Sequence, residues 1–154
     1  MYKPMHLPDT LRNSVSRYGA AAWSFIFGML HALWASGFYI LLPAEQAAEA
    51  FKRNAFFIYN LVVVGICIIG FLLALIQSNI IRTKISNQAI RFFGYGVVVL
   101  LALRGLAGLI QVLYIVIVHD KVFSLMALWD VWFCLGAFLY FLNTRPRPRA
   151  RVLI

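Results

Sequence analysis

The residues of this chain that could do chemistry are polar side chains placed inside long apolar runs. They are His31, Trp34, Asn60, Arg104, Gln111 and Asp130. A guanidinium can anchor an anionic or carbonyl group, an imidazole changes charge near neutral pH, and a carboxylate can pair with arginine. Polar and ionisable residues are rare within apolar membrane segments and usually mark a binding site or a proton path. We therefore interpret these six residues as a candidate ligand-binding site, which His31 would make sensitive to pH.

Arg104 and Asp130 are expected to form an ion pair. Asp130 is the only acidic residue inside an apolar run, and an unpaired arginine at the bilayer centre costs about 2.5–3.5 kcal/mol on insertion scales. In one reading the pair only locks two helices together, and His31 is satisfied by a hydrogen bond. In the other, these groups form a polar pocket for a small ligand, a lipid head group or a proton. Apolar contacts would join helices at lower cost than three ionisable groups, but the sequence leaves both readings open.

Several catalytic and cofactor chemistries lack their motifs. The sequence contains no H-E-x-x-H, paired-carboxylate or G-x-S-x-G pattern. Haem ligation by two histidines would need a second one within a run, but His6 precedes the first run and His119 follows the third. Cys67 and Cys134 are not part of a C-x-x-C motif and are expected to act as small buried hydrophobes. A transient disulfide between them is the alternative. We expect no cofactor and no metal site.

The composition indicates that these residues belong to a membrane protein. Of 154 residues, 63% are hydrophobic and 12% charged, with a mean hydropathy of +0.85, whereas soluble domains have about 25% charged residues. Each of four apolar runs approaches the roughly 20 residues that cross a bilayer; they cover residues 20–42, 55–77, 92–118 and 122–142. The first run is too long for the core of a signal peptide. The sequence therefore predicts an all-α, integral membrane, antiparallel four-helix bundle with up-down-up-down connectivity over residues 20–142.

The distribution of basic residues predicts the orientation of this bundle. Ten of them lie in the leader 1–19, between the second and third runs, and in the tail 143–154, whereas three lie on the opposite side. Because cytoplasmic segments carry an excess of Lys and Arg, both termini are expected on the cytoplasmic side of the inner membrane. The leader is read either as a short interfacial helix over 8–18 or as a disordered segment. The basic tail is expected to contact anionic lipid head groups or, alternatively, an acidic protein partner. Since the cations flank apolar runs, the net charge of +9 is not read as nucleic-acid binding.

Each predicted helix has one face of small or polar residues. In the first helix a stripe at four-residue spacing allows another helix to approach closely; it consists of Ala20, Ser24, Gly28, Ala32 and Ser36. Depth below the outer surface follows from the helical rise of about 1.5 Å per residue. On that scale Asn60, Gln111 and Asp130 lie about 8–12 Å deep, His31 about 16 Å and Arg104 about 20 Å. The polar groups of the four helices are therefore expected to converge in the outer half of the bilayer.

Three short segments resemble a known family. They are His31-Ala-Leu-Trp34-Ala35 in the first predicted helix, Leu103-Arg104-Gly105 in the third, and the aspartate Asp130 in the fourth. Together the chain resembles a family of small four-helix bacterial membrane proteins of unknown function over residues 20–142. The resemblance implies a bundle fold in a bacterial inner membrane and implies no reaction.

The leading functional interpretation is a non-enzymatic protein of the binding or transport type. Its partners would be the lipid bilayer and a small lipophilic or anionic ligand, bound in a pocket that opens toward the outer leaflet. Four spans are too few for the inverted repeats of most secondary transporters, so a transporter would need a homodimer. The second interpretation is an accessory subunit, assembly factor or immunity protein, whose small-residue stripe packs on a membrane-protein partner. The third is a membrane enzyme that acts on a lipid or quinone through His31 and Asp130.

Overall fold

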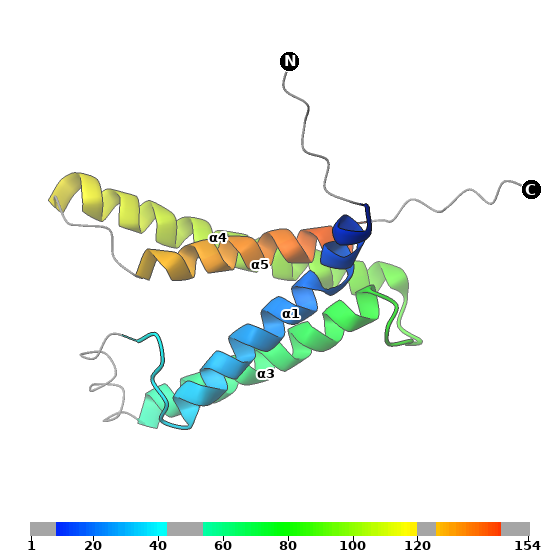
Figure 1. Ribbon diagram of the computed structural model, residues 1–154, viewed down its shortest axis with the longest axis horizontal. Coiled ribbons are helices and arrows are strands. Elements are labelled where there is room, and N and C mark those ends of the chain that lie inside the picture. The colour runs from blue at the N-terminus through cyan, green and yellow to red at the C-terminus, as the bar shows by residue number, and fades with distance from the viewer. Residues whose placement is uncertain (1–8, 43–53, 120–125, 146–154) are drawn as a thin grey trace, which may run out of the picture.

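The computed structural model describes residues 9–42, 54–119 and 126–145, and over these ranges all of the regular secondary structure is helical (Figure 1). The four helices run over the following residues: α1 Asp9–Ala35, α3 Asn54–Gln77, α4 Asn87–His119 and α5 Met126–Thr144. The predicted all-α class is therefore confirmed.

The helices pack as two antiparallel pairs. α1 lies along α3, α4 lies along α5, and contact between α1 and α5 joins the pairs, whereas α3 and α4 touch each other little. The pairs converge where α1 and α4 begin and diverge toward the opposite end (Figure 1). We call the first the closed end and the second the open end. The predicted antiparallel bundle is confirmed, but it is splayed rather than closed along its whole length.

Three of the four helices are long and apolar enough to cross a membrane. These segments are Asn54–Gln77, Asn87–Val118 and Ala127–Thr144. Their outer faces carry large exposed apolar side chains, for example Ile69 at 68% and Leu100 at 69% exposure, which match lipid rather than water. The chain is therefore a candidate multi-pass membrane protein. Helix α1 falls outside this set because polar side chains such as Ser24 and His31 interrupt its apolar residues.

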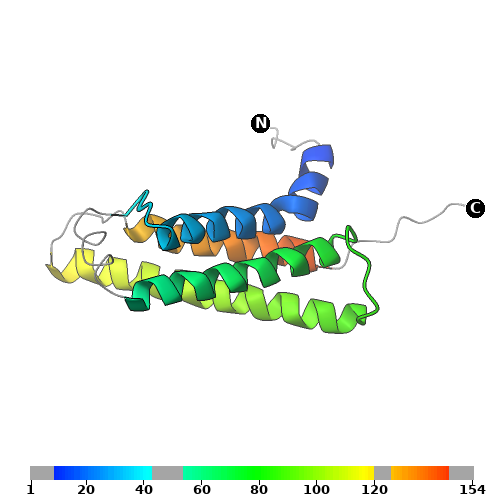
Figure 2. The same ribbon diagram turned by 90° about the horizontal axis from the view of Figure 1, so that it is seen from below.

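The first helix differs most from the expected boundaries. It begins at Asp9 rather than at residue 20. Most of the segment 8–18, expected as a separate short helix, therefore forms the start of α1. Figure 2 shows these first turns bent away from the rest of the helix. It ends at Ala35 rather than at residue 42 because Gly37 adopts a φ of 89°. The backbone N–H groups of Gly37 and Phe38 donate to the carbonyls of Trp34 and Leu33 at 3.1 and 2.9 Å. This bond pattern is the Schellman motif that terminates helices at glycine.

The core joins α1 to α5. The ring of Trp23 stacks against that of Trp132 with centroids 5.9 Å apart, and Trp23 Nε1 donates to the backbone oxygen of Trp132 at 3.0 Å. A Cβ at Gly136 of α5 would overlap the Trp23 ring, so this glycine allows the close approach. One turn further, the hydroxyls of Ser24 and Tyr140 are hydrogen-bonded at 2.6 Å. These contacts hold the two helix pairs together.

A group of polar side chains at the closed end also joins the pairs. We call it the polar clamp; it consists of Gln77, Ser78, Asn143 and Thr144. Asn143 Nδ2 donates to the Ala74 carbonyl at 3.1 Å, and Thr144 Oγ1 donates to Gln77 Oε1 at 3.2 Å. Ser78 Oγ lies 3.0 Å from Asn143 Oδ1. Three of the four clamp side chains are buried, so the clamp ties the end of α5 to the end of α3. Asn143 and Thr144 were assigned to the C-terminal tail, but α5 continues through them.

Candidate functional site

The predicted ion pair between α4 and α5 is present. Arg104 Nη1 donates to Asp130 Oδ1 at 2.7 Å. The carboxylate lies directly over Gly108 of α4, where a Cβ would overlap it. At Gly105, one turn away, a Cβ would lie 2.9 Å from the backbone of α5. Two glycines therefore bring the helix backbones close and leave room for a buried carboxylate.

The two members of this pair have unequal exposure. The Asp130 side chain is 7% exposed, but the Arg104 side chain is 56% exposed. A guanidinium has five N–H donors, and only the bond to Asp130 satisfies one of them among the described residues. The guanidinium carbon also lies 4.9 Å from the centroid of the Phe133 ring, a cation–π contact that orients the group. The carboxylate is thus fixed, and Arg104 presents its remaining donors to the space between the helix pairs.

A buried hydrogen-bond chain orients His31. The Asn60 amide donates from Nδ2 to the Phe56 carbonyl at 2.7 Å, so its oxygen faces His31 and accepts from Nδ1 at 2.7 Å. In the neutral imidazole this assigns the proton to Nδ1 and leaves a lone pair on Nε2. Nε2 has no hydrogen-bond partner within the described ranges. His31 is therefore satisfied on one side, as the locking interpretation expected, and available as an acceptor on the other.

Three aromatic rings also pack against His31. The ring centroids of Phe27, Trp34 and Tyr59 lie 4.6, 4.7 and 5.9 Å from that of His31. Trp34 Nε1 donates to the Ile40 carbonyl at 2.8 Å, so this indole fixes the segment that follows α1. Trp34 acts here through packing, since its only N–H donor is already used.

A cavity of about 530 Å³ lies at the open end and collects most of the predicted site. Its volume falls within the roughly 300–1,000 Å³ range of small-molecule pockets. The predicted residues that line it are His31, Trp34, Arg104, Gln111 and Asp130. Asn60 does not line this cavity; it is fully buried behind His31 and uses both amide groups within the protein. We call this space the polar cavity.

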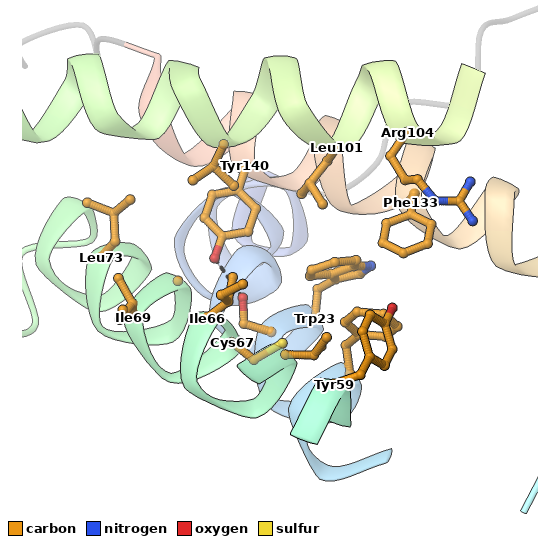
Figure 3. Close-up of a pocket in the computed structure, with 15 residues that line it drawn as sticks. Trp23, Tyr59, Ile66, Cys67, Ile69, Leu73, Leu101, Arg104, Phe133 and Tyr140 are labelled. Carbon is orange, nitrogen blue, oxygen red and sulfur yellow. Dashed lines mark hydrogen bonds between the residues drawn. The ribbon is translucent and has the colours of Figure 1, made fainter. Parts of the chain in front are cut away.

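A second cavity of about 360 Å³ runs between α3 and α4 (Figure 3). We call it the apolar groove. Ile66, Ile69 and Leu73 of α3 form one wall and Leu101 of α4 the other, with Trp23 and Tyr140 between them. This groove is not predictable from the sequence, because α3 and α4 are apolar on nearly all sides and their periodicity does not say which faces meet. Tyr140 of α5 and Ser24 of α1, whose hydroxyls are hydrogen-bonded to each other, also line it.

The two cysteines pack within helix interfaces. Cys67 and Cys134 are free thiols. Cys67 packs against Gly28 in the α1–α3 pair, and Cys134 packs against Gly105 in the α4–α5 pair, so each occupies a different helix interface. Among residues 9–42, 54–119 and 126–145, no cluster of three or more His, Cys, Asp or Glu could hold a metal ion.

The chain was compared with protein-family models, curated proteins and solved structures, and none of the three comparisons found a match. The resemblance to the family of small four-helix bacterial membrane proteins stays a prediction.

Proposed function

We propose that this chain is a polytopic inner-membrane protein that binds a small ligand in the polar cavity through a carbonyl or anionic group. The observation that carries the proposal is the state of Arg104. One of its guanidinium nitrogens is paired with Asp130, but the side chain remains 56% exposed, and Arg104 lines a cavity that His31 and Gln111 also line. A ligand oxygen would satisfy donors that are costly to leave unpaired in a low-dielectric surrounding.

The geometry favours binding over a purely structural lock. A lock requires only that the two charges satisfy each other, and buried pairs of that kind are weak sources of stability compared with apolar packing. Such a lock would explain the burial of Asp130. It would not explain why Arg104 and His31 line the same cavity.

The structure also bears on the interpretation of the chain as a subunit of a larger assembly. That interpretation uses the small-residue stripe of the first helix to pack a partner. Ala20 and Ser24 are 0% and 2% exposed, and Gly28 contacts Cys67 of α3. Most of the stripe is therefore used within the protein, and the argument for a partner helix on this face loses its main support.

Native mass spectrometry of the purified protein tests the proposal. A small molecule should be retained by the wild type and lost in the Arg104→Gln variant. The double variant Arg104→Gln with Asp130→Asn removes both charges without leaving a lone buried carboxylate, so it should fold and also lose the molecule. Arg91→Gln, an exposed arginine on the same helix outside the cavity, should retain it. Equal retention by all variants, or none in the wild type, would refute the proposal.

Four spans with both termini in the cytoplasm belong to the same proposal, supported by the basic residues and by the three candidate spans. The test uses a membrane-impermeant maleimide on intact cells after replacement of the two native cysteines. Ile80→Cys, in the exposed α3–α4 connection, should be labelled only after permeabilisation. Ile40→Cys, at the open end, should be labelled in intact cells. The reverse pattern would show the opposite orientation, and equal labelling of both would rule out a spanning α1–α3 pair.

A further inference from the structure

The polar cavity and the apolar groove adjoin each other. Both are lined by Phe27, Tyr59, Arg104 and Phe133. Figure 3 shows the Arg104 guanidinium beside Phe133 at one end of the groove, with the aliphatic side chains of α3 and α4 extending away from it. A ligand that contacts Arg104 with one end therefore has an apolar path for the other. The proposed function uses only the polar part of this space.

The charges at the polar end favour an uncharged head group. Within the described ranges, Arg104 is the only Lys or Arg and Asp130 the only Asp or Glu that lines the cavity. They lie 2.7 Å apart and cancel each other, so an anion would be attracted by one and repelled by the other at short range. The free groups are hydrogen-bonding ones: spare Arg104 donors, the His31 Nε2 acceptor and the Gln111 amide. They match a head group that offers both carbonyl and hydroxyl oxygens.

The groove requires a partner that comes from the membrane. It lies between α3 and α4, which contact each other little. Ile66 and Ile69, which line the groove on α3, are 62% and 68% exposed, so the rim on this side is apolar. A lipid chain can pass this rim sideways without leaving an apolar surrounding, whereas a water-soluble molecule gains nothing from the groove.

We infer that the site takes a single-chain amphiphile with a neutral, carbonyl-bearing head: the head binds Arg104, His31 and Gln111, and the chain lies in the groove between α3 and α4. This inference rests on the proposed function and narrows it to a ligand class. A monoacylglycerol and a quinone with an apolar tail share this chemistry.

The test uses tryptophan quenching by dibromostearoyl glycerol in nanodiscs of uncharged lipid. Trp23 lines the groove, so bromines in a bound chain should quench it saturably. Val97→Phe narrows the groove and should weaken binding about tenfold, a difference of 1.4 kcal/mol. Val99→Phe is the matched control, because Val99 is 55% exposed outside the groove; it should bind like the wild type. Decylubiquinone and unlabelled monoacylglycerol as competitors distinguish the two sources of the head group.

The other outcomes separate this inference from the proposed function. Tighter binding of dibromostearate, the anion with the same chain, would overturn the neutral head while leaving an Arg104 site intact. Equal displacement by monoacetin, which has the head without the chain, would overturn the role of the groove alone. Quenching that persists unchanged in the double variant of Arg104→Gln with Asp130→Asn would overturn both. An absence of saturable quenching in the wild type would overturn the inference, and retention of another molecule in native mass spectrometry would then decide the proposed function separately.

Discussion

At the scale of single residues, Arg104 and Asp130 should respond unequally to mutation. Arg104→Gln leaves a carboxylate that is 7% exposed without its charge partner, and loss of one member of a buried pair costs about 3 kcal/mol. Asp130→Asn keeps a side chain of the same shape over Gly108. The unpaired charge is then on Arg104, whose side chain is 56% exposed, so the loss of stability should be about 1 kcal/mol. Thermal unfolding in detergent measures both. Equal losses of stability would contradict this reading of the pair.

The close packing of Asp130 against α4 makes an exchange of the two charged residues uninformative. Exchanging the two charges would place an arginine at position 130, where the side chain lies so close to α4 that Gly108 has no room for a Cβ. A failed exchange would then report a steric clash rather than a missing function. The isosteric amide variants avoid this problem.

The second prediction concerns the support of His31. Asn60→Leu removes the acceptor for Nδ1 and leaves a buried donor unsatisfied, which should destabilise the protein by about 1–3 kcal/mol. The double variant His31→Leu with Asn60→Leu removes both partners, so its loss should be smaller than the sum of the two single losses. Chemical unfolding of the four proteins completes the cycle. Additive losses would show that the 2.7 Å contact contributes no coupling.

The sequence predicted which polar side chains lie together better than it predicted what each of them contacts. Five of the six candidates line one cavity, because helical periodicity determines which side chains share a face. Asn60 shares that face but is used up by His31 and the Phe56 carbonyl. Whether an amide contacts a ligand or a neighbouring side chain depends on its position to within about an ångström. The spacing of residues along the sequence does not determine positions that closely.

At the scale of helices, glycines set the distance between α4 and α5. Gly105→Ala should destabilise the protein by about 1–3 kcal/mol, because its Cβ meets the α5 backbone, which cannot move aside cheaply. Gly96→Ala on the same helix has no neighbour within 4 Å. It should be neutral or stabilising by up to about 1 kcal/mol, since alanine favours helix over glycine. Thermal melting of the two variants compares them directly, and similar melting points would contradict the packing role of Gly105.

The helix ends were predicted with mixed success for a physical reason. Hydropathy marks where apolar residues stop, so α3 begins and ends within one residue of the predicted 55–77. α1 ends early because the backbone at Gly37 turns into a positive φ, while the chain around it stays apolar. A helix over 8–18 was one of two readings of the leader, but its continuity with the apolar helix was not predicted, because polar residues can continue a helix without adding hydropathy.

At the scale of the whole molecule, the closed end holds the helix pairs while the open end separates them. Asn143→Leu removes the central member of the polar clamp and should broaden the distribution of distances between the pairs at the open end. Spin labels at Leu61 of α3 and Leu113 of α4, both exposed, report this distance by pulsed electron paramagnetic resonance. Phe141→Leu, on the exposed side of the same helix, is the control and should leave the distribution unchanged. A distribution that stays narrow in Asn143→Leu would show that the α1–α5 core alone sets the splay.

The splay itself was beyond prediction from the sequence. Four apolar helices with one polar face each are compatible with a closed bundle, in which α3 would pack on α4. The pairing depends on details such as Trp23 fitting over Gly136 and Tyr140 reaching Ser24. These contacts draw α5 toward α1 and leave α3 and α4 apart.

Under the proposed function, the groove between α3 and α4 would also determine which concentration of ligand the site responds to. A groove whose open side adjoins the bilayer samples molecules by their surface density in one leaflet, not by their molarity in water. Two membranes with equal total amounts of an amphiphile would then occupy the site differently if their areas differ. Occupancy would rise when the same amount of that lipid is held in a smaller membrane area. The protein would therefore respond to the surface density of the lipid rather than to its total amount.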